Sequence, residues 1–569
     1  MDTSLGGRWT IGILLIILAS AAGPRLFRLD RVPPGLHVDE AANAWNAYTL
    51  LRTGKDQHGV SWPVFYTRAF GENRSVSYIY ALLPFQALGG MNVWTTRLPA
   101  AAAGLGAILL IYFVGARLFG RLTGLAAAGI LAFNPWHLLV SRMGLEAALT
   151  PLLVLGSVAA LLWSHMPLDD AEPRRPRPAA AALAGGVAGI SCYGYWAVRL
   201  FLPVFFLAAP LVAGRAWLGR LKTREGALAL GAMVVAGAVS FGPLFWKHLA
   251  DPEAGRRARI QGWVWSESDT TVERIEKVLG RYPAHFGADF LFLRGDGDPG
   301  HAPPSGTGLF QWYDLPLMIA GLAICLRRAK SSRAARLLLL WVVLYPVALY
   351  PVADLLNEHP TMHYLRSLPG LPALVLLAAV GSAGVGTWLW QRRQATLAIC
   401  CGALILILIF NVRFFREYFS DDFYRQRYLS GAYGPGILQA ASWIQPHLKE
   451  ADAVVVQQAW IAHPYVFTLV GLGYDPEQWF RDRREIVRGP LADGTYPYED
   501  VYLSYGKIHF MFADSSVPAL RNLAQNGRRD RVFFIVMPGD MGLDKQSRPV
   551  HEIRDAKGRT LVEIYELDL

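Results

Sequence analysis

Two adjacent carboxylates and a histidine stand in the stretch PPGLHVDEAANAWNAY, directly after the apolar N-terminal run. They are His37, Asp39 and Glu40, and a later acid, Glu146, follows another apolar run in SRMGLEAALTP. A carboxylate can act as general base toward a hydroxyl, and an acid at the end of a membrane helix is a candidate for function because it is costly there. The simpler interpretation is that Asp39 caps the next helix and that Glu40 is a solvated first-turn residue.

Three arginines are expected at the same membrane boundary as these acids. They are Arg74 in FGENRSVSYIY, Arg199 in YGYWAVRLF and Arg366 in HYLRSLPG. Each alone is explained by a long side chain that reaches the lipid headgroups. Together with carboxylates they suit an anionic headgroup held beside a general base, and an amphiphilic phosphate is the natural candidate. Tyr195 could stack on a sugar, and His363 near Arg366 could bind phosphate or acceptor.

A divalent cation could bind these residues, but they do not require one. Oxygen and imidazole ligands for it are available at His37, Asp39, Glu40 and Glu146. The three arginines could neutralise a phosphate without a metal. His359 and His363 are four residues apart, but Pro360 between them weakens a shared helical face, so a zinc site is not expected. We therefore predict no essential metal and assign no cofactor.

The composition is that of an integral membrane protein. The 569 residues are 53% hydrophobic and 17% charged, with a mean hydropathy of +0.26. The formal net charge of +11 comes from basic residues in short clusters between apolar runs, which indicates topology signals and not a nucleic-acid-binding face. The four cysteines lie within or beside apolar runs, so no disulfide framework is predicted.

Eleven apolar runs are long enough to be membrane-span candidates. They lie near 10–27, 97–117, 122–140, 146–166, 179–196, 199–214, 226–246, 313–326, 335–355, 368–390 and 396–412. A twelfth run, 76–90, is about fifteen residues long and better suits an interfacial or re-entrant helix. The first run also fits a cleavable signal peptide.

The basic clusters orient these runs, because short cytoplasmic loops are enriched in Lys and Arg. An eleven-span arrangement with an internal N-terminus places the clusters inside. Segments 28–96, 247–312 and the tail 413–569 are then extracytoplasmic. The inside loops are too short for a nucleotide-binding domain, so chemistry is expected outside. We predict a membrane module over 1–412 and a small mixed α/β domain over 413–569, from patterns such as GILQAASWIQPHL, ADAVVVQQA and RVFFIVM.

The acid pair also predicts a local helix. Pro33 and Pro34 cannot continue the first helix, and from Glu40 the chain reads as a helix that ends at Gly54. Asp39 then lies at or next to the first helical residue, where the helix dipole stabilises a carboxylate.

These stretches carry a family resemblance. The run PPGLHVDEAANAWNAYTLLRTGKDQHGVSWPVFY, with FGENRSVSYIYALLPFQALGGMNVWTTRLPA and GARLFGRLTGLAAAGILAFNPWHLLVSRMGLEA, resembles the N-terminal module of GT-C glycosyltransferases. Among these it is most similar to bacterial relatives of protein O-mannosyltransferases and lipid A aminoarabinose transferase. The resemblance covers about the first 200 residues, with weaker similarity at GDGDPGHAPPSGTGLFQWYDLPL and HYLRSLPGLPAL.

The resemblance implies a mainly α, GT-C-like polytopic protein of the inner (plasma) membrane, with its active site and C-terminal domain extracytoplasmic. Such a protein transfers a sugar, with inversion, from a polyprenyl monophosphate carrier to a glycan, lipid or protein hydroxyl. On the family pattern Asp39 is the base, Glu40 its partner and Glu146 an acid near the acceptor. Arg74 takes the place of a lysine near the donor phosphate, but Ser75 and Val76 replace the prolines that follow that lysine in relatives.

Two other functions stay open. A lipid-phosphate site would also fit a flippase, and a large tail would also fit a binding protein. A flippase for lipid-linked sugars should show polar residues in midspan or repeated halves, and neither is evident in the sequence. The third interpretation is a surface-anchored binding protein in which the tail does the work.

Overall fold

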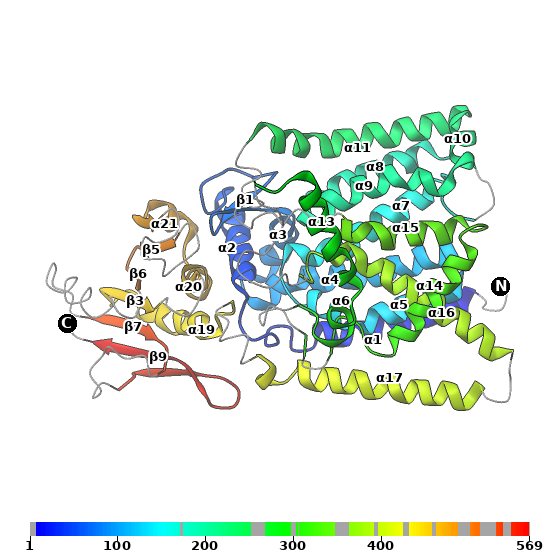
Figure 1. The fold of residues 1–569 in the computed structure, drawn as a ribbon. Coiled ribbons are helices and arrows are strands. Elements are labelled where there is room, and N and C mark those ends of the chain that lie inside the picture. The colour runs from blue at the N-terminus through cyan, green and yellow to red at the C-terminus, as the bar shows by residue number, and fades with distance from the viewer. Residues whose placement is uncertain are drawn as a thin grey trace. The chain divides into compact units, whose positions relative to one another are not determined.

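The computed structural model describes most of the chain in two compact units. The described residues are 7–170, 175–251, 268–296, 303–304, 307–347, 363–391, 396–424, 432–457, 463–487, 501–511, 531–538 and 548–567. Unit 1 comprises Met1–Phe27 and Ala100–Tyr418, and unit 2 comprises Arg28–Pro99 and Phe419–Leu569. Figure 1 shows their elements, and each unit is described by itself below.

Unit 1 is a bundle of helices, and helix α4 begins in unit 2 before it enters this bundle. Its α-helices are α1 (Gly7–Leu26), α4 (Val93–Phe119), α5 (Arg121–Phe133), α6 (Pro135–Val140), α7 (Thr150–Trp163), α8 (Pro178–Ser191), α9 (Trp196–Ala213), α10 (Arg215–Leu221), α11 (Arg224–Ala250), α13 (Thr271–Arg281), α14 (Asp314–Arg328), α15 (Arg333–Val347), α16 (Leu371–Trp390) and α17 (Thr396–Tyr418). Shorter helical turns are η1 (Glu146–Leu149), η3 (Tyr282–Phe286), η4 (Asp289–Leu293) and η5 (Leu368–Gly370).

Six helical segments in the described part of the chain are long and apolar enough to cross a membrane. They are Gly7–Leu26, Val93–Phe119, Glu146–Trp163, Trp196–Ala213, Arg224–Ala250 and Leu368–Trp390. Helices are favoured in such sequences because the bilayer core offers no water to bond the backbone. The protein is a multi-pass membrane protein.

All eleven predicted apolar runs coincide with helices, but the number of spans stays a prediction. Helices α5, α8, α14 and α15 have 13 to 15 residues, fewer than the ~20 of a typical span. Part of the run near 335–355 lies outside the described residues, as does His359. The short run 76–90 forms the 13-residue helix α3 (Ser77–Gly89).

Glycines bring helices of unit 1 into close contact. Helices α14 and α16 pack against each other, and so do α8 and α11 (Figure 1). A Cβ atom on Gly321 of α14 would lie 1.9 Å from the carbonyl oxygen of Leu377, and one on Gly381 of α16 would lie 1.9 Å from that of Leu317. Small residues at such contacts are typical of membrane helices, whose association relies on packing and not on the hydrophobic effect.

Unit 2 combines the segment after α1 with the tail. Its helices are α2 (Val38–Thr53), α3, α19 (Pro435–Ile444), η6 (Gln445–His447), α20 (Pro464–Leu472) and α21 (Pro476–Arg481). A two-stranded hairpin is formed by β1 (Thr67–Ala69) and β2 (Glu72–Arg74). The other strands are β3 (Ala453–Gln457), β4 (Arg484–Val487), β5 (Val501–Tyr505), β6 (Ile508–Met511), β7 (Val532–Val536), β8 (His551–Arg554) and β9 (Thr560–Leu567).

The tail strands form one mixed sheet in the order β4-β5-β6-β3-β7-β9-β8. Strand β3 pairs in parallel with β6 and β7, and the other pairs are antiparallel. Strands β3 and β7 are buried along their whole length, which matches their continuous apolar sequences VVV and VFFIV. The prediction of a mixed α/β domain in the tail is confirmed.

Helix α2 is the predicted helix at the acid pair. It ends at Gly54, which has the left-handed φ of 69°. Its N-cap is His37, whose Nδ1 accepts a hydrogen bond from the Asp39 amide at 3.2 Å, while the Glu40 side chain accepts one from the His37 amide. The simpler interpretation of Asp39 as the cap was therefore wrong, because the residue two positions earlier caps the helix.

The core of unit 2 joins α2 to the tail. Trp45 of α2 packs edge to face on Trp479 of α21 at 5.9 Å, and the Trp479 Nε1 donates to the Gln57 carbonyl at 2.9 Å. Both indoles are fully buried. The predicted split into 1–412 and 413–569 did not foresee this packing, since α2 finds its apolar partners about 400 residues later in the chain.

Residues just before α2 also pair with the tail. The Val38 amide donates to the Ala432 carbonyl at 2.8 Å, and the Gly434 amide donates to the Leu36 carbonyl at 3.2 Å. Gly35 has φ +68°, and a Cβ atom there would lie 2.6 Å from the Cα of Pro435.

We predict that Gly35→Ala destabilises unit 2 more than Gly473→Ala does. Both glycines have positive φ, which costs an alanine ~1 kcal/mol, but a Cβ at Gly473 would meet nothing within 4 Å. The clash with Pro435 should add ~1–3 kcal/mol at position 35. Thermal unfolding of the full chain in detergent measures the difference, and equal midpoints for the two variants would contradict the contact.

Candidate functional site

The second acid of the pair, Glu40, is paired with a buried arginine. The Arg97 Nε donates to Glu40 Oε1 at 2.9 Å, and Nη2 donates to Oε2 at 2.9 Å. Both side chains are fully buried. Glu40 is therefore not the solvated first-turn residue of the simpler interpretation.

Arg97 also binds the turn that precedes α2. Its Nη1 donates to the carbonyls of Leu29 and Pro33 at 3.0 and 2.7 Å, and its Nη2 donates to the carbonyl of Gly35 at 2.6 Å. With the two bonds to Glu40, all five N–H donors of the guanidinium are used. Sequence reasoning did not single out Arg97, although an arginine at the first position of an apolar run was a usable signal.

The first acid, Asp39, pairs with Arg74 from the hairpin. The Arg74 Nη1 lies 2.7 Å from Asp39 Oδ1, and the Asp39 side chain stays 22% exposed. The hairpin turns at Phe70 and Gly71, which have φ values of 58° and 77°, as a two-residue turn between right-twisted strands requires. The structure thus brings together His37, Asp39, Glu40 and Arg74 in unit 2.

A histidine of the tail lies at this pair. The rings of His463 and Phe70 stack with centroids 4.1 Å apart, and the Arg74 guanidinium lies 5.0 Å from the centroid of the Phe70 ring. Burial first, and then the charge of Arg74, lower the pKa of His463 to about 3 against the opposing effect of the Asp39 charge. His463 is thus uncharged at neutral pH. No pattern in the sequence pointed to His463.

Arg199 lies in unit 1 at the start of α9, one turn after the buried Tyr195. Its Nε donates to the Cys192 carbonyl at 2.9 Å, and its Nη1 lies 3.2 Å from His248 Nε2 of α11. The guanidinium also lies 4.5 Å from the Trp196 ring centroid. These contacts hold the Arg199 side chain within the protein. It therefore does not simply extend to the lipid headgroups.

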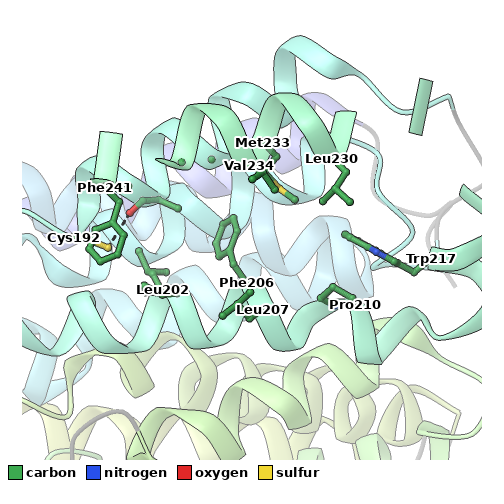
Figure 2. A pocket seen from close by; sticks show the side chains of 15 residues that line it. Cys192, Leu202, Phe206, Leu207, Pro210, Trp217, Leu230, Met233, Val234 and Phe241 are labelled. Atoms are coloured by element: carbon green, nitrogen blue, oxygen red, sulfur yellow. Dashed lines mark hydrogen bonds between the residues drawn. The ribbon is translucent and has the colours of Figure 1, made fainter. Parts of the chain in front are cut away.

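An apolar cavity of about 390 Å³ has among its lining residues Cys192, whose carbonyl accepts the hydrogen bond from Arg199. Figure 2 shows its lining, which runs from Cys192 and Phe241 at one end to Trp217 at the other. Most of the lining comes from α8, α9 and α11, with Trp217 from α10, and its side chains are apolar.

His363, in one of the two stretches of weaker family similarity, contacts the other stretch. Its Nδ1 lies 3.6 Å from Oδ2 of the buried Asp296, and the same oxygen accepts from the Tyr364 amide at 3.0 Å. Arg366 follows in the same turn and is partly buried. Glu146 is buried at the first residue of η1. Asp296 is a residue that sequence reasoning missed, although it lies in the GDGDPG stretch.

The candidate residues thus fall in both units, with Glu146, Tyr195, Arg199, His363 and Arg366 in unit 1. Among the residues that the structure describes, no group of three or more His, Cys, Asp or Glu side chains could hold a metal ion.

The fold is similar to that of solved structures of ArnT, which agrees with the family resemblance drawn from the sequence. ArnT from Cupriavidus metallidurans in the apo state aligns with a TM-score of 0.53 and 13% identity over 98% of each chain. The same protein bound to undecaprenyl phosphate aligns with a TM-score of 0.51 and 14% identity over 97% of this chain and 98% of that one. At this identity the similarity establishes the fold. No protein-family model and no curated protein sequence matches the chain.

We expect Glu40→Gln to destabilise unit 2 by ~3–5 kcal/mol, because it leaves the Arg97 charge buried without a counter-charge. Glu477→Gln is the matched control, since Glu477 is also a first-turn acid but is exposed. That change should stay within ~0.5 kcal/mol of the parent. Unfolding in detergent, followed by tryptophan fluorescence, measures both, and similar stability of the two variants would refute the structural importance of the ion pair.

Proposed function

We propose that this protein transfers a sugar from a polyprenyl monophosphate carrier to an acceptor hydroxyl on the extracytoplasmic side of the membrane. The observation that carries the proposal is the partly exposed Asp39 carboxylate, which Arg74 and the first turn of α2 hold in a GT-C fold. The fold similarity to ArnT, which has been seen with undecaprenyl phosphate bound, supports the class of donor.

Asp39 is the proposed general base. Its carboxylate accepts the acceptor hydroxyl proton while the acceptor oxygen bonds to the anomeric carbon. The bond from that carbon to the phosphate oxygen breaks, and its electron pair leaves with the phosphate. A phosphate leaving group needs no acid, so one carboxylate suffices, and direct displacement inverts the anomeric centre. Glu146 is proposed to lie near the acceptor.

Positive charge is proposed to serve the phosphate. Arg74 supplies a guanidinium beside Asp39, and Arg199 supplies one that is bonded to Cys192, a lining residue of the apolar cavity. His37, Tyr195, His363 and Arg366 are proposed to contact the sugar, the phosphate or the acceptor. The cavity between α8, α9 and α11 would take the isoprenoid chain nearest the headgroup. A glycan or lipid-linked acceptor is preferred to a protein.

The first experiment replaces the base. Asp39→Asn keeps the shape of the side chain but cannot take the proton, so turnover should fall ~10²–10⁴-fold while carrier binding persists. Release of free polyprenyl phosphate from a labelled polyprenyl-phosphate sugar, in the presence of acceptor, measures the rate. Asp30→Asn is the control, since Asp30 lies in the same unit and is half-exposed. Full activity of Asp39→Asn would refute the role, and movement of intact carrier across liposomes without release would identify a flippase.

The second experiment fills the cavity. Val234→Trp places an indole in its lining, whereas Val235→Trp changes the next residue of α11, which does not line the cavity and is similarly exposed. We expect the first variant to raise the KM for the carrier about tenfold or more, which corresponds to a loss of ~1.4 kcal/mol, and the second to leave it unchanged. Equal KM values for both variants would exclude the cavity as the chain-binding site.

A further inference from the structure

The tail reaches the acid pair at two places within unit 2. Ala432 and Gly434 bond to the backbone on either side of His37, and the Tyr433 ring packs edge to face on the His37 ring at 5.2 Å. These contacts fix the residues that begin α2. The second place is the stack of His463 on Phe70, beside Arg74.

The His463 backbone is held in an unfavourable conformation. Its φ is +51°, and Pro464 follows it, which disfavours any helical conformation for the preceding residue. Such conformations persist only where the surroundings enforce them. Two rings contact His463 here. The Phe70 ring stacks on the imidazole, and the centroid of the Tyr465 ring lies 6.3 Å from that of the imidazole.

An uncharged aromatic ring suits this position. A cation there would repel Arg74 and compete with it for Asp39, and an anion would draw Arg74 away. A neutral imidazole does neither, yet its stacking restricts the Phe70 ring, and the Arg74 guanidinium lies against that ring. The path from the tail to the carboxylate is therefore His463 to Phe70 to Arg74 to Asp39.

We propose that His463 of the C-terminal segment is a positioning residue for the Asp39–Arg74 pair, acting through the Phe70 ring, so that the tail is a component of the catalytic apparatus. The proposal rests on the proposed function, in which Asp39 is the base. It gives the tail a role other than recognition of the acceptor.

The test compares three substitutions in the full-length protein. His463→Ala removes the ring and should lower kcat about 10²-fold, the scale of a ~1 Å misplacement, with KM for the carrier changed less than threefold. His463→Phe keeps an uncharged ring and should restore kcat to within about threefold of the parent. His447→Ala is the control, because His447 is a tail histidine that stacks on Trp443 instead.

The outcomes separate this proposal from the proposed function. No turnover by the parent protein refutes the function itself. Parent turnover with an unimpaired His463→Ala variant overturns the role of His463. If His463→Ala does not fold, His463→Phe decides: a folded but inactive variant overturns the stacking role, and an active one supports it.

Discussion

The geometry of the acid pair depends on how one buried charge is neutralised. Removing Arg97 and Glu40 from water costs several kcal/mol for each ion, and only a bidentate pair with every donor used offsets such a cost. The carbonyls that complete the arrangement belong to the turn before α2, so the ion pair holds that turn and the first turn of the helix together. Asp39, one residue before Glu40, is thereby fixed in direction. Adjacent residues of one helix point about 100° apart, so one acid is buried and paired while the other is 22% exposed.

The segment that carries the acids could not form a core by itself. It has short strands and two helices, and small units bury too little surface to be stable alone. The tail supplies what is lacking, because its helices α20 and α21 pack against α2, with Trp479 of α21 on Trp45. The described tail contains no cysteine, so this packing holds without disulfides. The tail is therefore part of the structure that presents Asp39, which is hard to reconcile with an independent binding domain on a membrane anchor.

Local patterns predicted local structure well. The apolar runs are helical, α2 ends at Gly54, and the strand-like patterns ADAVVVQQA and RVFFIVM contain the strands β3 and β7. Contacts between distant residues were not predictable from one sequence. Arg97 is 57 residues from Glu40, and His463 is nearly 400 residues from Phe70. Even the cap of α2 was misassigned, because the preference of aspartate for N-caps is weaker than the turn geometry that Arg97 imposes at residues 29–35. The sequence thus indicated which residue types matter and missed the partners that hold them.

Under the proposed function, the apolar cavity and Arg199 would contribute unequally to the affinity for the carrier. An isoprenoid chain gains little hydrophobic free energy when it moves from lipid into an apolar cavity, because lipid tails are equally apolar. The walls between α8, α9 and α11 would therefore position the chain and give little affinity of their own, so that an indole in the cavity weakens binding by displacing the headgroup along with the chain. Under the proposed function, affinity would therefore come from the phosphate headgroup, for which the proposed partner is the Arg199 guanidinium held by the Cys192 carbonyl and His248. Because the surrounding dielectric is low there, such a charge pair is stronger than in water. The phosphate, and not the length of the chain, should then decide which lipids bind.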